Sequence, residues 1–223
     1  MGNINKELAN KLNYDKKVYL KDSSGNRYKI EVDYDYYPEN PREWDNVCHI
    51  MSIKGNWDIA DEGLSFSRDD AFDKLKELEK DPDIIVKPVY IYEHSGQTIR
   101  LIPFGDPWDS GVCGYIYVNK DEVIREIGNA TEENWKEKAE ITMDHEIEVY
   151  DQFICGEVYG VRVYQRDVIE CKSTISGNMW TTEEWEQIDS CYGFYGYDFE
   201  ENGLIECALE SLPDDVEIIE EED

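Results

Sequence analysis

Alternating apolar and polar positions recur along this chain and predict strands. Residues 16–22 and 26–37 alternate in this way around Ser-Ser-Gly-Asn, which predicts a hairpin. Residues 84–104 predict two strands around the turn Ser95-Gly96, and Pro88 inside the first predicts an edge strand or a bulge. Further strands are expected at 111–119, 157–165, 167–175 and 186–195.

Apolar residues at helical spacing predict helices between these strands. The longest helix is expected over 132–153, with Trp135, Ala139, Met143, Ile147 and Tyr150 facing inward. Asn119 is expected to cap a helix over 120–128, and Asn202 one that Pro213 ends. Shorter helices are expected over 3–12 and 69–80.

The mixture of hairpins and helices predicts an α+β fold, with a mostly antiparallel twisted sheet, several flanking helices and an acidic C-terminal extension. The chain has 223 residues, shows no internal repeat and contains no linker rich in Pro, Gly or Ser. We therefore expect a single domain over 1–212. Residues 213–223, with few apolar positions, are expected to form a flexible acidic tail.

The charge changes this picture most. The chain carries 52 acidic and 22 basic residues, for a formal net charge of −30. From Ser173 onward there are sixteen Asp or Glu and neither Lys nor Arg. Such a surface repels nucleic acid and anionic membranes. It favours basic protein partners, although acidity can also serve only to keep a protein soluble.

The cysteines and the first residues indicate a cellular setting. Six cysteines lie apart from one another without a Cys-x-x-Cys motif, and the first twelve residues are polar. Reduced thiols and the lack of an apolar leader favour the cytoplasm. No apolar run approaches membrane-spanning length.

Motifs for catalysis and for cofactors are missing from the sequence. It contains no glycine-rich phosphate loop, no dinucleotide fingerprint, no nucleophile elbow and no His-Glu-x-x-His. We therefore predict no catalytic residue, no cofactor and no enzymatic activity. A calcium loop at Asp198, Glu200 and Asn202 is a weak alternative, because position twelve is Leu209 and Glu210 comes one residue late.

Two polar loops contain large aromatic residues. Arg42 and Trp44 lie in the first, and Trp108 and Asp109 in the second. Such aromatics can anchor a ligand or a partner. They can equally close the end of a sheet, with Arg42 paired to an acid, and this structural interpretation is favoured. A small-molecule site or an enzyme built on the Trp44 and Trp108 loops is the alternative function.

Several segments together carry a resemblance to a known family. The segments NPREWDN, YEHSG, PWDSGVCGYIYV, EVYDQFICGEVYG and CYGFYGYD, in this order between residues 39 and 198, resemble an uncharacterised family of small acidic proteins from phages and mobile elements of Gram-positive bacteria. That family has no established biochemical activity, so the resemblance implies no catalytic residue. It implies synthesis in the cytoplasm of a bacterial host cell, by an element that must survive host defences.

The acidity and this setting lead to a function hypothesis. We predict a polyanionic, nucleic-acid-mimicking inhibitor of a host defence nuclease or another nucleic-acid-binding protein, such as an anti-CRISPR or anti-restriction protein. Aromatic residues among the acids would add contact area. The expected contact residues are Glu137, Glu140, Asp144, Glu148, Glu183, Glu184, Glu186, Asp189, Asp198, Glu200 and Glu201. A calcium-steadied interaction module is a further alternative.

Overall fold

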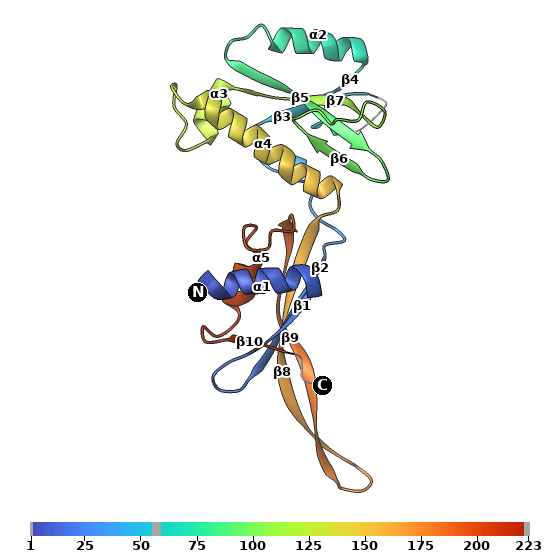
Figure 1. Ribbon diagram of the computed structural model, residues 1–223, viewed down its shortest axis with the longest axis vertical. Coiled ribbons are helices and arrows are strands. Elements are labelled where there is room, and N and C mark those ends of the chain that lie inside the picture. The colour runs from blue at the N-terminus through green and yellow to red at the C-terminus, as the bar shows by residue number, and fades with distance from the viewer. Residues whose placement is uncertain (1, 55–58, 221–223) are drawn as a thin grey trace. The chain divides into compact units, whose positions relative to one another are not determined.

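The computed structural model describes residues 2–54 and 59–220 and has an α+β fold (Figure 1). Its contacts divide the chain into two compact units. The terminal unit combines Met1–Pro38 with Glu157–Asp223, and the central unit is Glu39–Gly156. Each unit has its own cluster of buried apolar side chains. This arrangement differs from the single domain that the sequence predicted, because the hydrophobic pattern does not show which strands pair across the chain.

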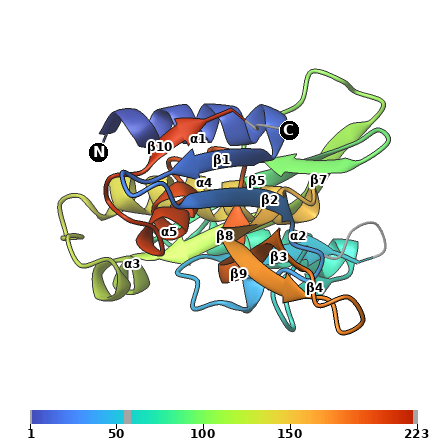
Figure 2. The ribbon, with the colours of Figure 1, turned by 90° about the horizontal axis from the view of Figure 1, so that it is seen from below.

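The terminal unit is built on an antiparallel sheet with the strand order β10-β1-β2-β8-β9. Its strands are β1 (Lys17–Lys21), β2 (Arg27–Tyr34), β8 (Val158–Lys172), β9 (Met179–Tyr195) and β10 (Glu217–Ile219). Two helices, α1 (Gly2–Asp15) and α5 (Leu204–Glu210), pack into the core on one face of this sheet. Helix α1 lies beside β1 (Figure 2). The opposite face carries no helix among the described residues of this unit.

Strict alternation decides which side chains face that core. On β1 the buried residues are Val18 and Leu20, and on β2 they are Tyr28, Ile30 and Val32. The residues between them, which are mostly charged or aromatic, therefore point to the open face. The hairpin predicted around Ser-Ser-Gly-Asn is confirmed.

Strands β8 and β9 form one long hairpin, which corrects the three strands predicted from 157 to 195. The pairing runs from Val158 opposite Tyr195 to Lys172 opposite Met179. Arg166 and Asp167 lie within the strand, and the turn comes later, in residues 173–178 before Met179. Strand β2 pairs with β8 only as far as Gln165. Residues 166–185 therefore form a two-stranded ribbon, called the β8–β9 arm below.

The flexible acidic tail expected over 213–223 is also corrected, because part of this segment is an ordered strand. Val216 is buried, and β10 pairs with β1, with Ile218 opposite Leu20 and packed against the core. Apolar residues within this acidic segment gain more from burial than the chain loses by becoming ordered. Residues 221–223 lie outside the described part of the chain.

The central unit holds a second sheet, with the strand order β4-β3-β7-β5-β6. Its strands are β3 (His49–Ile53), β4 (Ser65–Phe66), β5 (Ile84–Glu93), β6 (Gln97–Arg100) and β7 (Ser110–Asn119). All pairs are antiparallel except β3 with β4. The helical segments are η1 (Pro41–Glu43), α2 (Arg68–Leu78), α3 (Lys120–Glu126) and α4 (Trp135–Ile154).

Local predictions in the central unit are confirmed. The five inward positions expected on the long helix are all buried on α4. Asn119 caps α3 in a capping box with Glu122. Strand β6 pairs with β5 only from Tyr90 onward, so among the described strands Pro88 pairs with β7 alone and lies on a local edge. The register also shifts just after it, between Val89 and Tyr90, so the edge and the bulge are both present.

Candidate functional site

The predicted acidic contact residues are all exposed, but they lie on three separate elements. Glu137, Glu140, Asp144 and Glu148 share the solvent face of α4 in the central unit. Glu183, Glu184, Glu186 and Asp189 lie on β9, and Asp198, Glu200 and Glu201 precede α5, both in the terminal unit. Neither unit gathers all eleven carboxylates on one face.

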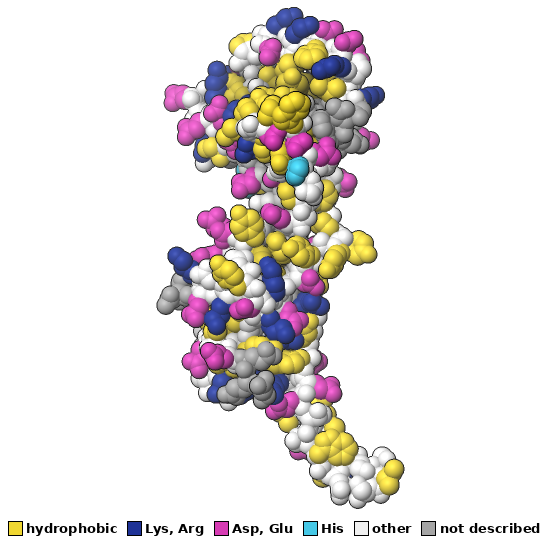
Figure 3. Space-filling view, turned by 45° about the vertical axis from the view of Figure 1, so that its right-hand side comes forward, with side chains coloured by type: hydrophobic (Ala, Val, Ile, Leu, Met, Phe, Trp, Pro, Cys, Tyr) yellow, Lys and Arg dark blue, Asp and Glu magenta, His cyan; other side chains and the backbone are white. Residues whose placement is uncertain are grey.

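Strand β9 combines its acids with an open strand edge. It has seventeen residues and, within the described part of the chain, pairs only with β8. An edge strand offers a row of backbone N–H and C=O groups to a further strand. Exposed apolar side chains accompany the acids along this hairpin, and Figure 3 shows such side chains on the surface of the arm. They are Val168, Ile169, Ile175, Met179, Trp180, Ile188 and Tyr192.

The cross-strand pairing within the arm brings acids close to each other. Glu184 lies directly opposite Asp167, a pairing of like charges that destabilises a hairpin. Glu183 lies opposite Val168, on the other face of the ribbon, where it forms an ion pair with Arg166. Carboxylates therefore stand on both faces of β9. A cation supplied from outside would relieve the Glu184–Asp167 repulsion.

Arg42 is a structural residue. Its side chain is only 4% exposed, and it donates to Asp61 at 2.8 Å, to Glu146 at 2.8 Å and to the carbonyl of Cys48 at 2.7 Å. Burial alone would lower the pKa of Arg42, but the hydrogen bonds and charges of the two carboxylates outweigh it and raise that pKa. The pairing of Arg42 with an acid, expected as the structural alternative, is confirmed.

The two tryptophan loops differ in exposure. Trp44 is 42% exposed and Trp108 is 91% exposed. Asp106 accepts hydrogen bonds from the backbone N–H of Trp108 and Asp109, and Asp109 lies 3.0 Å from His94. A side chain as exposed as Trp108 does not line an enclosed pocket, so this loop gives no support to a small-molecule site.

The groups suggested for calcium are engaged within their own turn. Asp198 accepts from the backbone N–H of Glu200 and Glu201, each at 3.2 Å. Asn202 donates to the carbonyls of Tyr195 and Gly196, and its Oδ1 accepts from Leu204. Gly203, with φ at 83°, occupies the cap position that was expected for Asn202. Among the described residues, no group of three or more His, Cys, Asp or Glu is arranged to hold a metal ion.

The open face of the terminal sheet contains a cluster that the sequence reasoning missed. Six bases point to it, namely Lys17, Lys21, Arg27, Lys29, Arg162 and Arg166. The aromatic residues Tyr19, Tyr164 and Trp185 stand among them. One signal was available in the sequence: the first 38 residues hold seven bases against six acids, in a chain with more than twice as many acids as bases.

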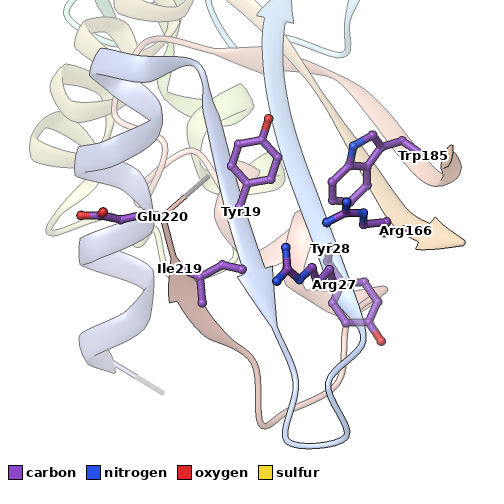
Figure 4. A pocket seen from close by; sticks show the side chains of 7 residues that line it. All are labelled: Tyr19, Arg27, Tyr28, Arg166, Trp185, Ile219 and Glu220. Carbon is purple, nitrogen blue, oxygen red and sulfur yellow. The ribbon is translucent and has the colours of Figure 1, made fainter. Parts of the chain in front are cut away.

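Rings and cations of this cluster contact one another, and Figure 4 shows four of its members, Tyr19, Trp185, Arg27 and Arg166. The ring centroids of Tyr19 and Trp185 are 5.8 Å apart. The Lys29 Nζ lies 4.1 Å from the ring centroid of Tyr164 and 5.3 Å from that of Trp185. These are cation–π distances. A shallow hollow of about 80 Å³ beside them is lined by Arg27 and Arg166 and also by the acid Glu220.

The thiols give a prediction about accessibility. Burial raises the pKa of Cys113 to about 12 and also raises the pKa of Cys48, whereas Cys155 is exposed. Since the thiolate is the reactive form, we expect iodoacetamide at about pH 8 to alkylate Cys155 first and to reach Cys48 and Cys113 only on unfolding. Peptide mass mapping over time measures this. Alkylation of native Cys113 as fast as Cys155 would contradict the burial.

Within the described residues, every helix is too short or too polar to cross a membrane. Searches against models of protein families, against curated proteins and against solved structures find no match for this chain.

Proposed function

We propose that this protein is a non-enzymatic inhibitor that binds a basic nucleic-acid-binding protein through the edge of β9. The observation that carries the proposal is the coincidence, on one seventeen-residue edge strand, of four exposed acids with exposed apolar side chains. Charge alone gives long-range attraction, but apolar and aromatic area gives a specific contact. Both are present on β9.

The charge on β9 selects the kind of partner. A free strand edge can pair with any extended segment, including β9 of a second copy. Two copies would bring their acids together, so these carboxylates oppose self-association. A segment rich in Lys and Arg gains the same backbone hydrogen bonds without that repulsion. Such segments are common where proteins bind nucleic acid.

Helix α4 provides a second acidic surface for the same class of partner. Its four exposed acids span three turns, about 16 Å along the axis at 1.5 Å per residue. Neighbouring acids are therefore about 5 Å apart along the axis, which is wider than the spacing of about 3.4 Å between phosphates along one DNA strand. Only Glu140 among them approaches a base in a described ion pair, with Lys87 at 3.8 Å. The α4 face has little apolar surface besides Ile141, so we assign it the weaker contribution.

The proposed target class follows from the setting inferred above. In a bacterial cell that carries a mobile element, a basic nucleic-acid-binding protein worth inhibiting is a defence nuclease, either RNA-guided or of the restriction type. Inhibition would be competitive: the inhibitor occupies basic residues that would otherwise hold nucleic acid, and no bond is made or broken.

A pull-down with paired variants tests this function. The protein serves as bait in lysate from a nuclease-bearing host, and bound proteins are eluted with a salt gradient. The β9 variant Glu183→Gln/Glu184→Gln/Glu186→Gln/Asp189→Asn should weaken capture of the partner about tenfold. The α4 variant Glu137→Gln/Glu140→Gln/Asp144→Asn/Glu148→Gln removes the same number of charges and should retain most of the binding.

Competition with nucleic acid completes the experiment. Added duplex DNA or guide RNA should displace the captured protein if it occupies a nucleic-acid site. Equal loss in both four-residue variants would show that only the total charge matters and would reject β9 as the contact. If only ribosomal proteins were captured, and nucleic acid did not displace them, the proposed inhibition would be rejected, and the acidity would serve only to keep the protein soluble. Thermal unfolding of each variant verifies that it is folded.

A further inference from the structure

The open face of the terminal sheet contains a row of three bases on adjacent strands. Lys21 on β1 lies directly opposite Arg27 on β2. Arg27 and Arg166 each come next to the Tyr28–Gln165 pair, so Arg166 on β8 continues the row. Like charges directly opposite each other destabilise a sheet. In a chain with 22 bases and 52 acids, three bases in one row favour an anionic ligand.

A second row, one step along the same face, is aromatic. Tyr19 lies opposite Lys29, and Lys29 lies opposite Tyr164. Trp185, which pairs with Arg166, lies with its ring centroid 5.8 Å from that of Tyr19 (Figure 4), and the Lys29 Nζ lies 5.3 Å from the Trp185 ring. Three aromatic rings therefore stand beside the basic row, on the sheet face that carries no helix among the described residues of this unit. Both a phosphate and the flat face of a base would find a partner there.

We propose that this face binds single-stranded nucleic acid. Phosphates would lie along Lys21, Arg27 and Arg166, and unpaired bases would stack on Trp185 and Tyr19. The bases of a duplex are already stacked and paired, so a duplex would gain only the phosphate contacts. The hollow of about 80 Å³ is too small to enclose a separate small ligand, because such pockets measure roughly 300–1,000 Å³. This row of bases and the rings beside it, called the track below, form an open surface that suits a nucleic-acid strand crossing the sheet.

The net charge of −30 limits this interaction but does not prevent it. At physiological salt the Debye length is about 8 Å, so acids on other surfaces are largely screened. Acids stand beside the track: Glu31 pairs with Lys29 at 2.8 Å, Glu183 pairs with Arg166, and Glu220 lines the hollow together with Arg27 and Arg166. Phosphates would compete with these carboxylates. We therefore expect moderate affinity that falls steeply with salt.

This inference goes beyond the proposed function, because it assigns another surface and another ligand to the chain. A purified assay separates the two. Fluorescence anisotropy with labelled oligothymidylate and oligouridylate, and with a duplex of equal length, involves no protein partner. Binding of either single strand more tightly than the duplex supports the proposal, and comparison of the two shows whether DNA or RNA is preferred.

Variants of the track sharpen the test. Trp185→Ala should weaken single-strand binding about tenfold. Arg27→Gln/Arg166→Gln should weaken it and reduce the dependence of log affinity on log salt by about 0.7 for each phosphate that no longer meets a positive charge. Arg27→Lys/Arg166→Lys keeps the charge and should retain most of that salt dependence. Lys76→Gln/Arg125→Gln removes two exposed bases from the central unit and should bind as the wild type does.

Three results would overturn the proposal. They are the absence of single-strand binding by the wild type at low salt, equal affinity for duplex and single strands, and unchanged binding in both the Trp185 and the double-arginine variants. Thermal unfolding identifies a variant that has lost its fold. If Trp185→Ala proves unstable, the arginine pair and its lysine counterpart decide the question alone.

Discussion

Replacing Arg42 with Met is expected to destabilise the central unit by about 3–5 kcal/mol. The substitution keeps an unbranched apolar stem but removes the guanidinium cation that Asp61 and Glu146 share. Two carboxylates would then remain close together and largely buried, with no positive charge between them. The loss of this partner costs far more than an exposed ion pair, which contributes about 1 kcal/mol or less.

The same residues connect several parts of the central unit. Glu146 on α4 also accepts hydrogen bonds from the backbone N–H groups of Val47 and Cys48, and Asp61 accepts from that of Ile50. Loss of Arg42 should therefore loosen the loop that leads into β3 as well as its contact with α4. Hydrogen exchange of peptides from residues 40–53 and 135–154, with urea denaturation for the total effect, measures this.

A triple variant is the control for the Arg42 prediction. Arg42→Met/Asp61→Asn/Glu146→Gln removes all three charges, so it should recover part of the stability lost in Arg42→Met. If Arg42→Met cost less than about 1 kcal/mol, the ion network would contribute no more than a surface pair. The interpretation of Arg42 as a structural residue would then be wrong.

Gly114→Ala is the second substitution with a large expected effect, about 3 kcal/mol. A Cβ at Gly114, on β7, would lie 2.3 Å from the carbonyl oxygen of Met51 on the neighbouring strand β3. Since that neighbour is backbone, the clash is relieved only by moving one strand away from the other. The movement would strain the pairing in which Ser52 lies opposite Gly114.

Gly160→Ala provides the matched comparison. A Cβ there would lie 2.2 Å from the ring of Tyr192, but that side chain is 51% exposed and can rotate into solvent. The expected cost is about 1 kcal/mol, mainly because the ring no longer packs against the backbone. Urea denaturation of both variants tests the contrast. Equal costs would show that the identity of the neighbour, backbone or side chain, does not decide the effect.

Local features of the fold could be predicted because they depend on neighbouring residues. The five buried positions on α4 follow from helical spacing, and the capping box at Asn119 follows from Asn and Glu three residues apart. The local edge and the bulge at Pro88 are the two alternatives that a missing N–H allows, and both are present. In each case the physical cause lies within a few residues along the chain.

Pairings between distant residues could not be predicted in this way. The terminal unit joins β2 to β8, so that Tyr34 pairs with Tyr159, although all residues of the central unit lie between them in the sequence. Strand β10 pairs with β1 although one lies at each end of the chain. Alternation shows that a segment is a strand with one buried face, but not which strand it pairs with. Both the division into two units and the ordered C-terminal strand depend on that choice.

The sequence by itself determined the fold class, most helices and hairpins, and the acidity of the molecule, because these depend on composition and on short-range periodicity. Only the tertiary structure decided where the charges stand. It distributes the acids over α4, β9 and the turn before α5, and it gathers Lys21, Arg27 and Arg166 from three strands into one row. Net charge is a sum over the chain, whereas a binding surface depends on which few side chains the strand pairing places side by side.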